Sequence, residues 1–219
     1  MKHPLKLNSA WLESVCCEFS HEGRTPNPYF NPGIRARLRR GLERPEQESN
    51  QLLTGYLSRA GWSADSPLSS HIPYQITCSV FAWHPHAWHP PEEKSEKWKR
   101  PPNLGSLCRL IAMKRQEKPN SNLSDPTCVS IENNSFTPRF ERILSCRRPV
   151  QMIPHLRAVV RLLSPVSPPP LLDFNGLLKD LSWWQNDWAD EKGPRLRWAR
   201  EYWRETETVT KEEPITQTT

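Results

Sequence analysis

Apolar residues recur at spacings of three and four along most of this 219-residue chain, a spacing typical of one face of an α-helix. The apolar positions, in chain order, are Leu12, Val15 and Phe19; Ile34, Leu38 and Leu42; Leu52, Leu53, Tyr56 and Leu57; Leu104, Leu107 and Ile111; Phe140, Ile143 and Leu144; Ile153, Leu156, Val160 and Leu163; Leu177, Leu178, Leu181, Trp184 and Trp188; and Leu196, Trp198, Tyr202 and Trp203. The last group predicts a helix over about 195–204. Since all these elements are helical, the pattern predicts an all-α fold.

One apolar segment, residues 76–83, fits two periods. Ile76, Cys78 and Val80 alternate as in a strand, whereas Ile72, Ile76, Val80 and Trp83 share one face of a helix. A single strand without a partner elsewhere in the chain would leave its backbone hydrogen bonds unmade. We therefore predict a helix here.

Prolines and polar stretches divide the chain. It has 23 prolines, about twice the usual ~5%, and proline interrupts helix interiors. Asn103 and Asp173 are expected to cap helices. The predicted units are an N-terminal helical domain at 1–120 with a basic, proline-rich loop at 84–102, a polar linker at 121–135, a C-terminal helical bundle at 136–204 and a disordered acidic tail at 205–219. The fold expected is thus two small helical bundles joined by a polar linker.

The charge of the chain indicates a polyanionic partner. The net charge is +6 and the pI about 9.1, although the tail from residue 205 carries four glutamates and one lysine. Basic residues gather at 35–40, at 94–100 and at 139–161, where six arginines accompany a single acid, Glu141. The guanidinium fork suits phosphate oxygens, and binding a polyanion releases counterions. Because no base-reading motif is present, contact with the nucleic-acid backbone is the expected mode.

The ten tryptophans divide into two groups. Trp11, Trp184, Trp188 and Trp198 fall at helical apolar spacing, which predicts core packing. Trp88 and Trp98 lie in the basic loop, where they are candidates for stacking on exposed bases.

Three histidines, His84, His86 and His89, suggest a metal site, but their spacing matches no established zinc pattern and no carboxylate lies among them. A metal-dependent hydrolase using these histidines is therefore the least favoured alternative. The sequence shows no nucleophile with its base. We predict no metal, no cofactor and no enzymatic activity.

The cysteines and the hydropathy favour a cytoplasmic location. The six cysteines form no CxxC pair, and without a secretory signal they are expected to be reduced and buried. No stretch approaches the ~18 apolar residues of a membrane span.

Several short motifs resemble, in the same order, the CasB family, the small subunit of the type I-E CRISPR surveillance complex, Cascade. They are NPGIRARLRR at 31–40, NLGSLCRL at 103–110, RFERIL at 139–144, HLR at 155–157, LLKDL at 177–181 and WAREYW at 198–203. The resemblance extends from about Trp11 to Trp203. The loop 84–102 and the linker are longer than the family pattern.

The resemblance implies an all-helical, non-catalytic subunit present in two copies along the belly of the complex. It implies contacts with the other Cascade subunits, guide RNA and target DNA. By holding the guide–target heteroduplex and the displaced DNA strand, the subunit would stabilise the R-loop in antiviral defence. The basic positions that it carries over are Arg39, Arg40, Lys97, Arg139 and Arg157, to which charge placement adds Arg37, Arg100, Arg142 and Arg147. The alternative is a stand-alone helical protein that binds RNA or DNA without sequence preference.

Overall fold

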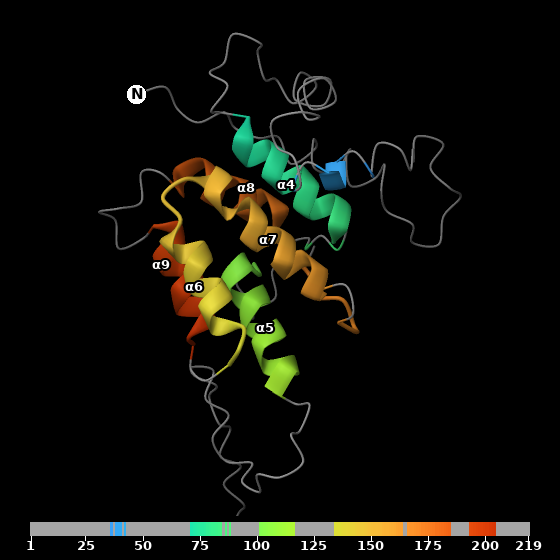
Figure 1. Ribbon diagram of the computed structural model, residues 1–219, viewed down its shortest axis with the longest axis vertical. Helices are drawn as coiled ribbons and strands as arrows, with labels where there is room; N and C mark the ends of the chain where they lie inside the picture. The colour runs from blue at the N-terminus through green and yellow to red at the C-terminus, as the bar shows by residue number, and fades with distance from the viewer. Residues whose placement is uncertain are drawn as a thin grey trace, which may run out of the picture.

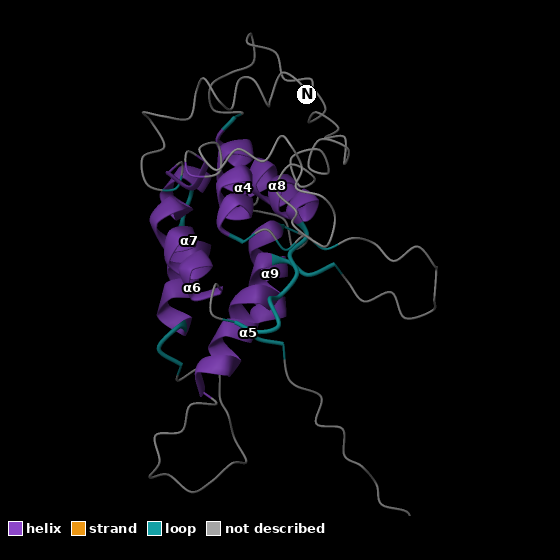
Figure 2. Ribbon diagram, turned by 90° about the vertical axis from the view of Figure 1, so that its right-hand side faces the viewer, coloured by secondary structure: helices purple, strands orange, loops and turns teal. Residues whose placement is uncertain are grey.

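The computed structural model describes residues 36, 38–40, 42, 71–84, 86, 88, 101–116, 134–163, 166–184 and 193–204. Its helices are α4 (Ile72–Trp83), α5 (Leu104–Gln116), α6 (Thr137–Ser145), α7 (Pro149–Leu163), α8 (Phe174–Trp183) and α9 (Pro194–Tyr202) (Figure 1). Residues 36 and 38–40 are also helical. The described part of the chain contains no β-strand (Figure 2), so the predicted all-α fold is confirmed. The helices predicted around Val15 and Leu53 lie outside the described residues.

Residues 76–83, the segment that fits two periods, lie in helix α4, so the prediction of a helix there is confirmed. Every residue from Pro73 to Ala82 is buried, and the helix packs against α7 and α8. A helix buried on all sides needs no polar face, which explains why its sequence shows no clear helical period. The hydroxyl of Thr77 donates to the Pro73 carbonyl at 2.8 Å, so this polar side chain is satisfied within the helix.

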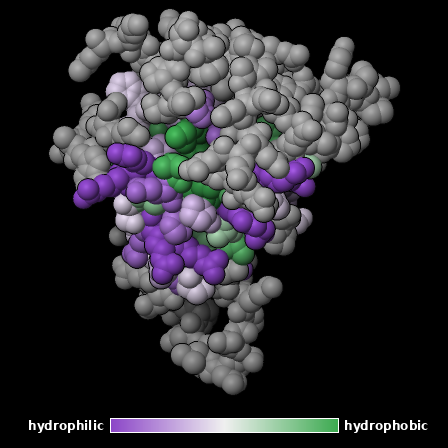
Figure 3. Space-filling view, turned by 45° about the horizontal axis from the view of Figure 1, so that its top comes forward, coloured by the Kyte–Doolittle hydropathy of each residue, from purple (hydrophilic) through white to green (hydrophobic). Residues whose placement is uncertain are grey.

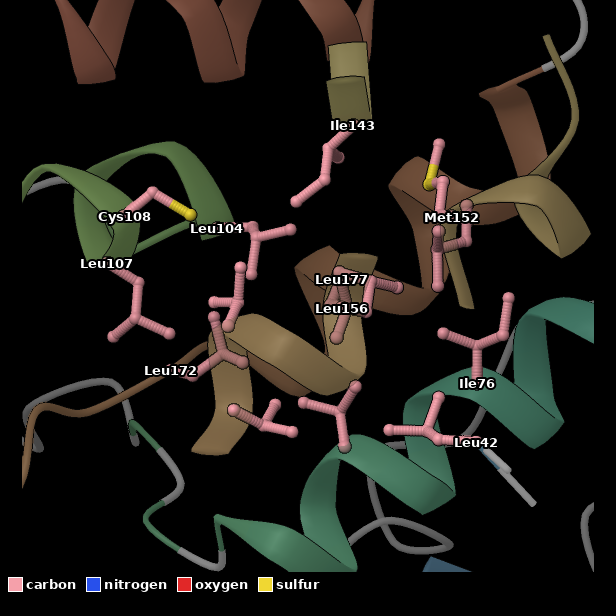
Figure 4. Packing of buried hydrophobic residues seen from close by; sticks show 14 of the residues in the cluster. Leu42, Ile76, Leu104, Leu107, Cys108, Ile143, Met152, Leu156, Leu172 and Leu177 are labelled. Atoms are coloured by element: carbon pink, nitrogen blue, oxygen red, sulfur yellow. The ribbon is translucent and has the colours of Figure 1, made fainter. Parts of the chain in front are cut away.

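Helices from both sides of the predicted linker share one hydrophobic core. Helix α5 packs against α9, and α4 packs against α7 and α8. Figure 4 shows side chains of α4, α5, α7 and α8 meeting in this core. Asn134, near the end of the predicted linker, is held to the N-terminal side, because its Nδ2 donates to the Ala112 carbonyl at 2.6 Å. The predicted boundary at 121–135 lies almost entirely outside the described residues, so the division into two units stays a prediction.

The helix ends follow local chemistry. Asn103 Oδ1 accepts from the backbone N–H of Ser106 at 3.0 Å, and Asp173 Oδ1 accepts from that of Gly176 at 2.9 Å. Both predicted N-caps are therefore confirmed. The start of α7 is also capped by a side chain. Gln151 Oε1 accepts hydrogen bonds from the backbone N–H groups of Arg147 and Arg148.

Helix α9 buries some of its predicted apolar positions and exposes others. Trp198 and Tyr202, one turn apart, are fully buried, whereas Leu196 and Trp203 are each 37% exposed. The indole Nε1 of Trp198 donates to Asp180 at 2.6 Å, and Arg197 pairs with the same carboxylate. These two bonds compensate the burial of Asp180, whose pKa is raised mainly by desolvation.

The buried tryptophans and thiols agree with the sequence analysis where the structure describes them. Trp184 and Trp198 are fully buried with ring centroids 4.8 Å apart, which confirms their predicted place in the core; Trp11 and Trp188 lie outside the described residues. Cys78, Cys108 and Cys146 are buried free thiols. No helix among the described residues is long and apolar enough to cross a membrane.

Candidate nucleic-acid interface

The structure describes the side chains of most of the predicted interface residues. Those described are Arg39, Arg40, Arg139, Arg142, Arg147 and Arg157. Arg37, Lys97 and Arg100 lie outside the described residues, as does Trp98, so their assignment stays a prediction. Of the two tryptophans proposed for base stacking, Trp88 is half-buried and its backbone N–H donates to the Leu172 carbonyl at 2.9 Å.

One basic surface belongs to α6 and the turn after it. Phe140 and Ile143 are fully buried, so the positions just before them face outward. Arg139 and Arg142, three residues apart, are both exposed, and such a spacing places side chains on the same face of a helix. Arg147 is exposed in the turn between α6 and α7. We call Arg139, Arg142 and Arg147 the α6 surface.

A second basic cluster surrounds the indole of Trp83 at the end of α4. The guanidinium carbons of Arg39 and Arg161 lie 5.1 and 5.6 Å from the centre of its ring, within cation–π range. Arg39 is fixed further, because its Nε donates to the Ala82 carbonyl at 2.9 Å and its own carbonyl accepts from Trp83 Nε1 at 3.3 Å. The segment around residue 39 is thus joined to α4 and α7 through one aromatic ring.

A groove of about 460 Å³ opens beside this cluster. Leu42, Val150, Ile153, Pro154, Arg157, Ala158 and Arg161 line it. The residues from α7 fall at spacings of three and four, so they form one stripe along that helix. The groove-lining residues that the structure describes are either apolar or arginine, and α7 contains no acidic residue. We call this feature the α7 groove.

The structure therefore brings Arg39 and Arg157 to one region, and Arg40 is exposed next to Arg39. In Figure 3, hydrophilic residues crowd the described part of one face around a small apolar area. Two residues that are not among the predicted site residues, Arg161 and Trp83, lie beside Arg39 in this cluster. The sequence could have indicated Arg161, because it follows Arg157 by four residues and so shares its helix face. No sequence pattern around Trp83 indicates its contact with these arginines.

The histidine segment follows the same end of α4 and shows the surroundings of a structural histidine. His84 is buried, and its Nε2 lies 2.6 Å from the Pro170 carbonyl. The His86 ring is 4.9 Å away, and His89 lies outside the described residues. Among the described residues no group of three His, Cys, Asp or Glu side chains is placed to hold a metal ion. A carbonyl partner favours the protonated Nε2 tautomer of His84.

Lowering the pH from 7.5 to 5.5 is expected to destabilise the protein in part through His84. Burial is the main cause that lowers the pKa of His84. Below the unfolded-state pKa of about 6.5 the unfolded chain therefore binds more protons, and stability falls with pH until the folded-state pKa is passed. Urea denaturation at the two pH values measures this change in the free energy of unfolding.

The matched control is His84→Gln, which keeps a donor for the Pro170 carbonyl and does not titrate. This variant should lose less stability on acidification than the natural protein. His71, whose pKa is also lowered by burial, remains in both proteins and acts in the same direction. Equal losses in both proteins would show that groups other than His84 cause the pH dependence.

The helices and surfaces described above define a small all-α protein with two arginine-rich faces. The chain belongs to the family of the CRISPR-associated protein Cse2, whose model matches residues 34–203. The resemblance to the CasB family is thereby confirmed, and membership supports the role of a type I-E Cascade subunit.

The fold is also that of a solved structure. The crystal structure of M. ruber CasB is 21% identical in sequence, with 92% of this chain and 94% of that chain covered and a TM-score of 0.57. This structural similarity supports the all-α fold of the chain. No curated protein sequence matches the chain.

Proposed function

We propose that this chain is the non-catalytic small subunit of a type I-E Cascade complex and stabilises the R-loop. It binds the nucleic-acid backbone of the guide–target heteroduplex and of the displaced DNA strand. Its partners are the other Cascade subunits, guide RNA, target DNA and a second copy of itself. The α6 surface and the α7 groove provide the phosphate contacts.

The observation that carries this proposal is the pair of arginines, Arg157 and Arg161, that line the α7 groove. Among the described residues, Arg157 and Arg161 line the groove together with apolar side chains, and Arg39 lies beside Arg161 on the ring of Trp83. The guanidinium fork matches the oxygens of a phosphate group, so a groove lined by two arginines suits contact with a nucleic-acid backbone. The α6 surface adds the exposed Arg139 and Arg142, with Glu141 as the exposed acid between them on the helix.

Such contacts are sufficient for the proposed role because R-loop formation is nearly balanced. The heteroduplex that forms is about as stable as the duplex that it replaces. A few charge-assisted bonds, each worth about 1.5–3 kcal/mol, then decide whether the loop stays open. Sequence is read by the guide, so this subunit needs no base-reading side chains.

Co-purification tests the assignment. A tagged copy of the chain is expressed with the effector genes that neighbour its own gene and with a repeat array. We expect a stoichiometric complex that contains guide RNA and more than one copy of this subunit. A chain that elutes alone, without RNA or other subunits, would contradict the Cascade assignment and favour the stand-alone binder.

A further inference from the structure

We propose that the acidic tail, residues 205–219, docks on the α6 surface and competes there with nucleic acid. This inference rests on the proposed function, because it names a regulator of the same phosphate-binding surface. Three features of the molecule support it: the place where the chain leaves α9, the charge of α6 beside that place, and the opposite charge of the residues that follow.

The chain leaves α9 directly beside α6. The ring of Tyr202 stacks on that of Phe140 with centroids 4.2 Å apart, and the ring of Trp203 meets the same phenylalanine edge-on at 5.7 Å. In addition, Arg109 of α5 donates from Nη1 to the carbonyls of Tyr202 and Arg204. The last residue that the structure describes before the acidic tail is therefore fixed next to α6.

Helix α6 presents two guanidinium groups near this exit. Arg139 directly precedes Phe140 in the sequence, Arg142 lies about one turn further on, and both side chains are exposed. Among the described residues, neither guanidinium takes part in a hydrogen bond or an ion pair. Glu141 is the exposed acid between them, and it offsets at most one of the two positive charges. This part of the α6 surface therefore retains positive charge for an anionic ligand.

The acidic tail carries the complementary charge. It contains one lysine and four glutamates, which are Glu205, Glu207, Glu212 and Glu213, so its side chains have a net charge of −3. A carboxylate accepts charge-assisted hydrogen bonds from a guanidinium group in the same bidentate geometry as a phosphate does. The tail can therefore occupy the place of a nucleic-acid backbone on α6.

The acidic tail is long enough to make this contact without any change in the described fold. An extended chain spans at most about 3.6 Å per residue, so Glu205 and Glu207 can extend up to about 7 and 14 Å from Trp203. The nine residues of α6 span about 14 Å at about 1.5 Å per residue. The first two glutamates can thus reach Arg139 and Arg142, and a ligand tethered this closely acts at an effective concentration in the millimolar range.

The docked tail limits the binding of the free subunit to nucleic acid outside the complex. Exposed ion pairs are individually weak, whereas a nucleic-acid duplex presents a dense row of phosphates and releases counterions when it binds. The guide–target heteroduplex therefore displaces the tail once the subunit is assembled beside it at high local concentration. The α6 surface is in this way kept for the nucleic acid that the complex itself presents.

The test measures docking and competition separately on the full-length chain. In a tail-neutral variant, glutamine replaces all four glutamates of the tail (Glu205→Gln, Glu207→Gln, Glu212→Gln and Glu213→Gln). Docking is followed by NMR of the arginine Nε–H groups at low salt. The signals of Arg139 and Arg142 should differ between the natural and tail-neutral proteins, whereas that of Arg157, whose Nε is buried, should not. At about 1 M salt, where the Debye length is only ~3 Å, the two proteins should give the same signals.

Competition is measured as the affinity for a short fluorescent DNA duplex at low salt. We expect the tail-neutral variant to bind the duplex about tenfold more tightly, the change to which two exposed ion pairs of ordinary strength correspond. Because the variant also has a higher net charge, the same four substitutions are made in an Arg139→Gln, Arg142→Gln background. There the gain in affinity should fall below about threefold, since only long-range repulsion between the tail and the duplex remains to be removed.

The matched control keeps every charge and changes only the tether. A Gly/Ser spacer of about thirty residues between Arg204 and Glu205 lowers the effective concentration of the tail, so this variant should show part of the gain at unchanged net charge. Unshifted signals of Arg139 and Arg142, with an equal gain in both backgrounds, would overturn the docking and leave only long-range repulsion. Shifted signals in a protein that binds no duplex would support the docking and contradict the phosphate contacts of the proposed function.

Discussion

Replacing Gly105 by alanine is expected to lower the free energy of unfolding by about 3 kcal/mol, at the upper end of the usual cost of overpacking. A Cβ at this position would lie 2.1 Å from the Trp198 carbonyl oxygen and 2.7 Å from its Cα. These are backbone atoms, so rotating a side chain cannot relieve the contact. Helices α5 and α9 must move apart, and the alanine's better helix propensity of about 1 kcal/mol only partly offsets this cost.

Gly176 offers a matched control for this substitution. A Cβ there would lie 2.6 Å from Asp173 Oδ2, which belongs to a side chain that can rotate. We therefore expect Gly176→Ala to change stability by less than about 1 kcal/mol, since the weakened cap and the improved propensity act in opposite directions. Urea denaturation of both variants measures the contrast. A Gly105→Ala protein as stable as the natural one would show that α5 and α9 do not pack this closely.

Local sequence signals predicted the helices that the structure describes, and two of their caps. The caps at Asn103 and Asp173 depend on side chains that bond a backbone N–H three residues away, so the sequence alone contains the information. Helix α4 was harder, because burial on all sides removes the polar face by which a helix is recognised. Leu196 and Trp203 show the opposite case, since helical apolar spacing does not establish that a given side chain is covered.

The candidate site was predictable only in part. Charge along the chain marked the arginines, and helical spacing placed Arg139 with Arg142 and Arg157 with Arg161. The stacking of Arg39 and Arg161 on Trp83 joins three segments far apart in the sequence, and no local pattern encodes such a contact.

Reversing the charge of Arg40, Arg139 and Arg157 together is expected to weaken target binding by the assembled complex roughly a thousandfold. If each arginine makes one charge-assisted bond to a phosphate, its loss costs about 1.5–3 kcal/mol, and three such losses exceed the ~4 kcal/mol that a thousandfold change requires. The R-loop lifetime should shorten accordingly, because a nearly balanced strand exchange depends on these contacts. Arg40 and Arg139 are exposed and Arg157 is half-buried, so little helical content should be lost.

The measurement is the dissociation rate of target DNA from the purified complex at several salt concentrations, with circular dichroism of the isolated subunit to verify its fold. Reversing Lys179 and Arg200 together provides the control, since both side chains are charged and exposed but lie on α8 and α9. Target DNA should dissociate from a complex with this control variant at nearly the natural rate. The triple variant should also show a shallower salt dependence, because fewer counterions are released when fewer phosphates are neutralised. An unchanged R-loop lifetime in a folded triple variant would exclude these arginines from the interface, whereas a shorter lifetime with an unchanged salt slope would indicate an effect on subunit assembly.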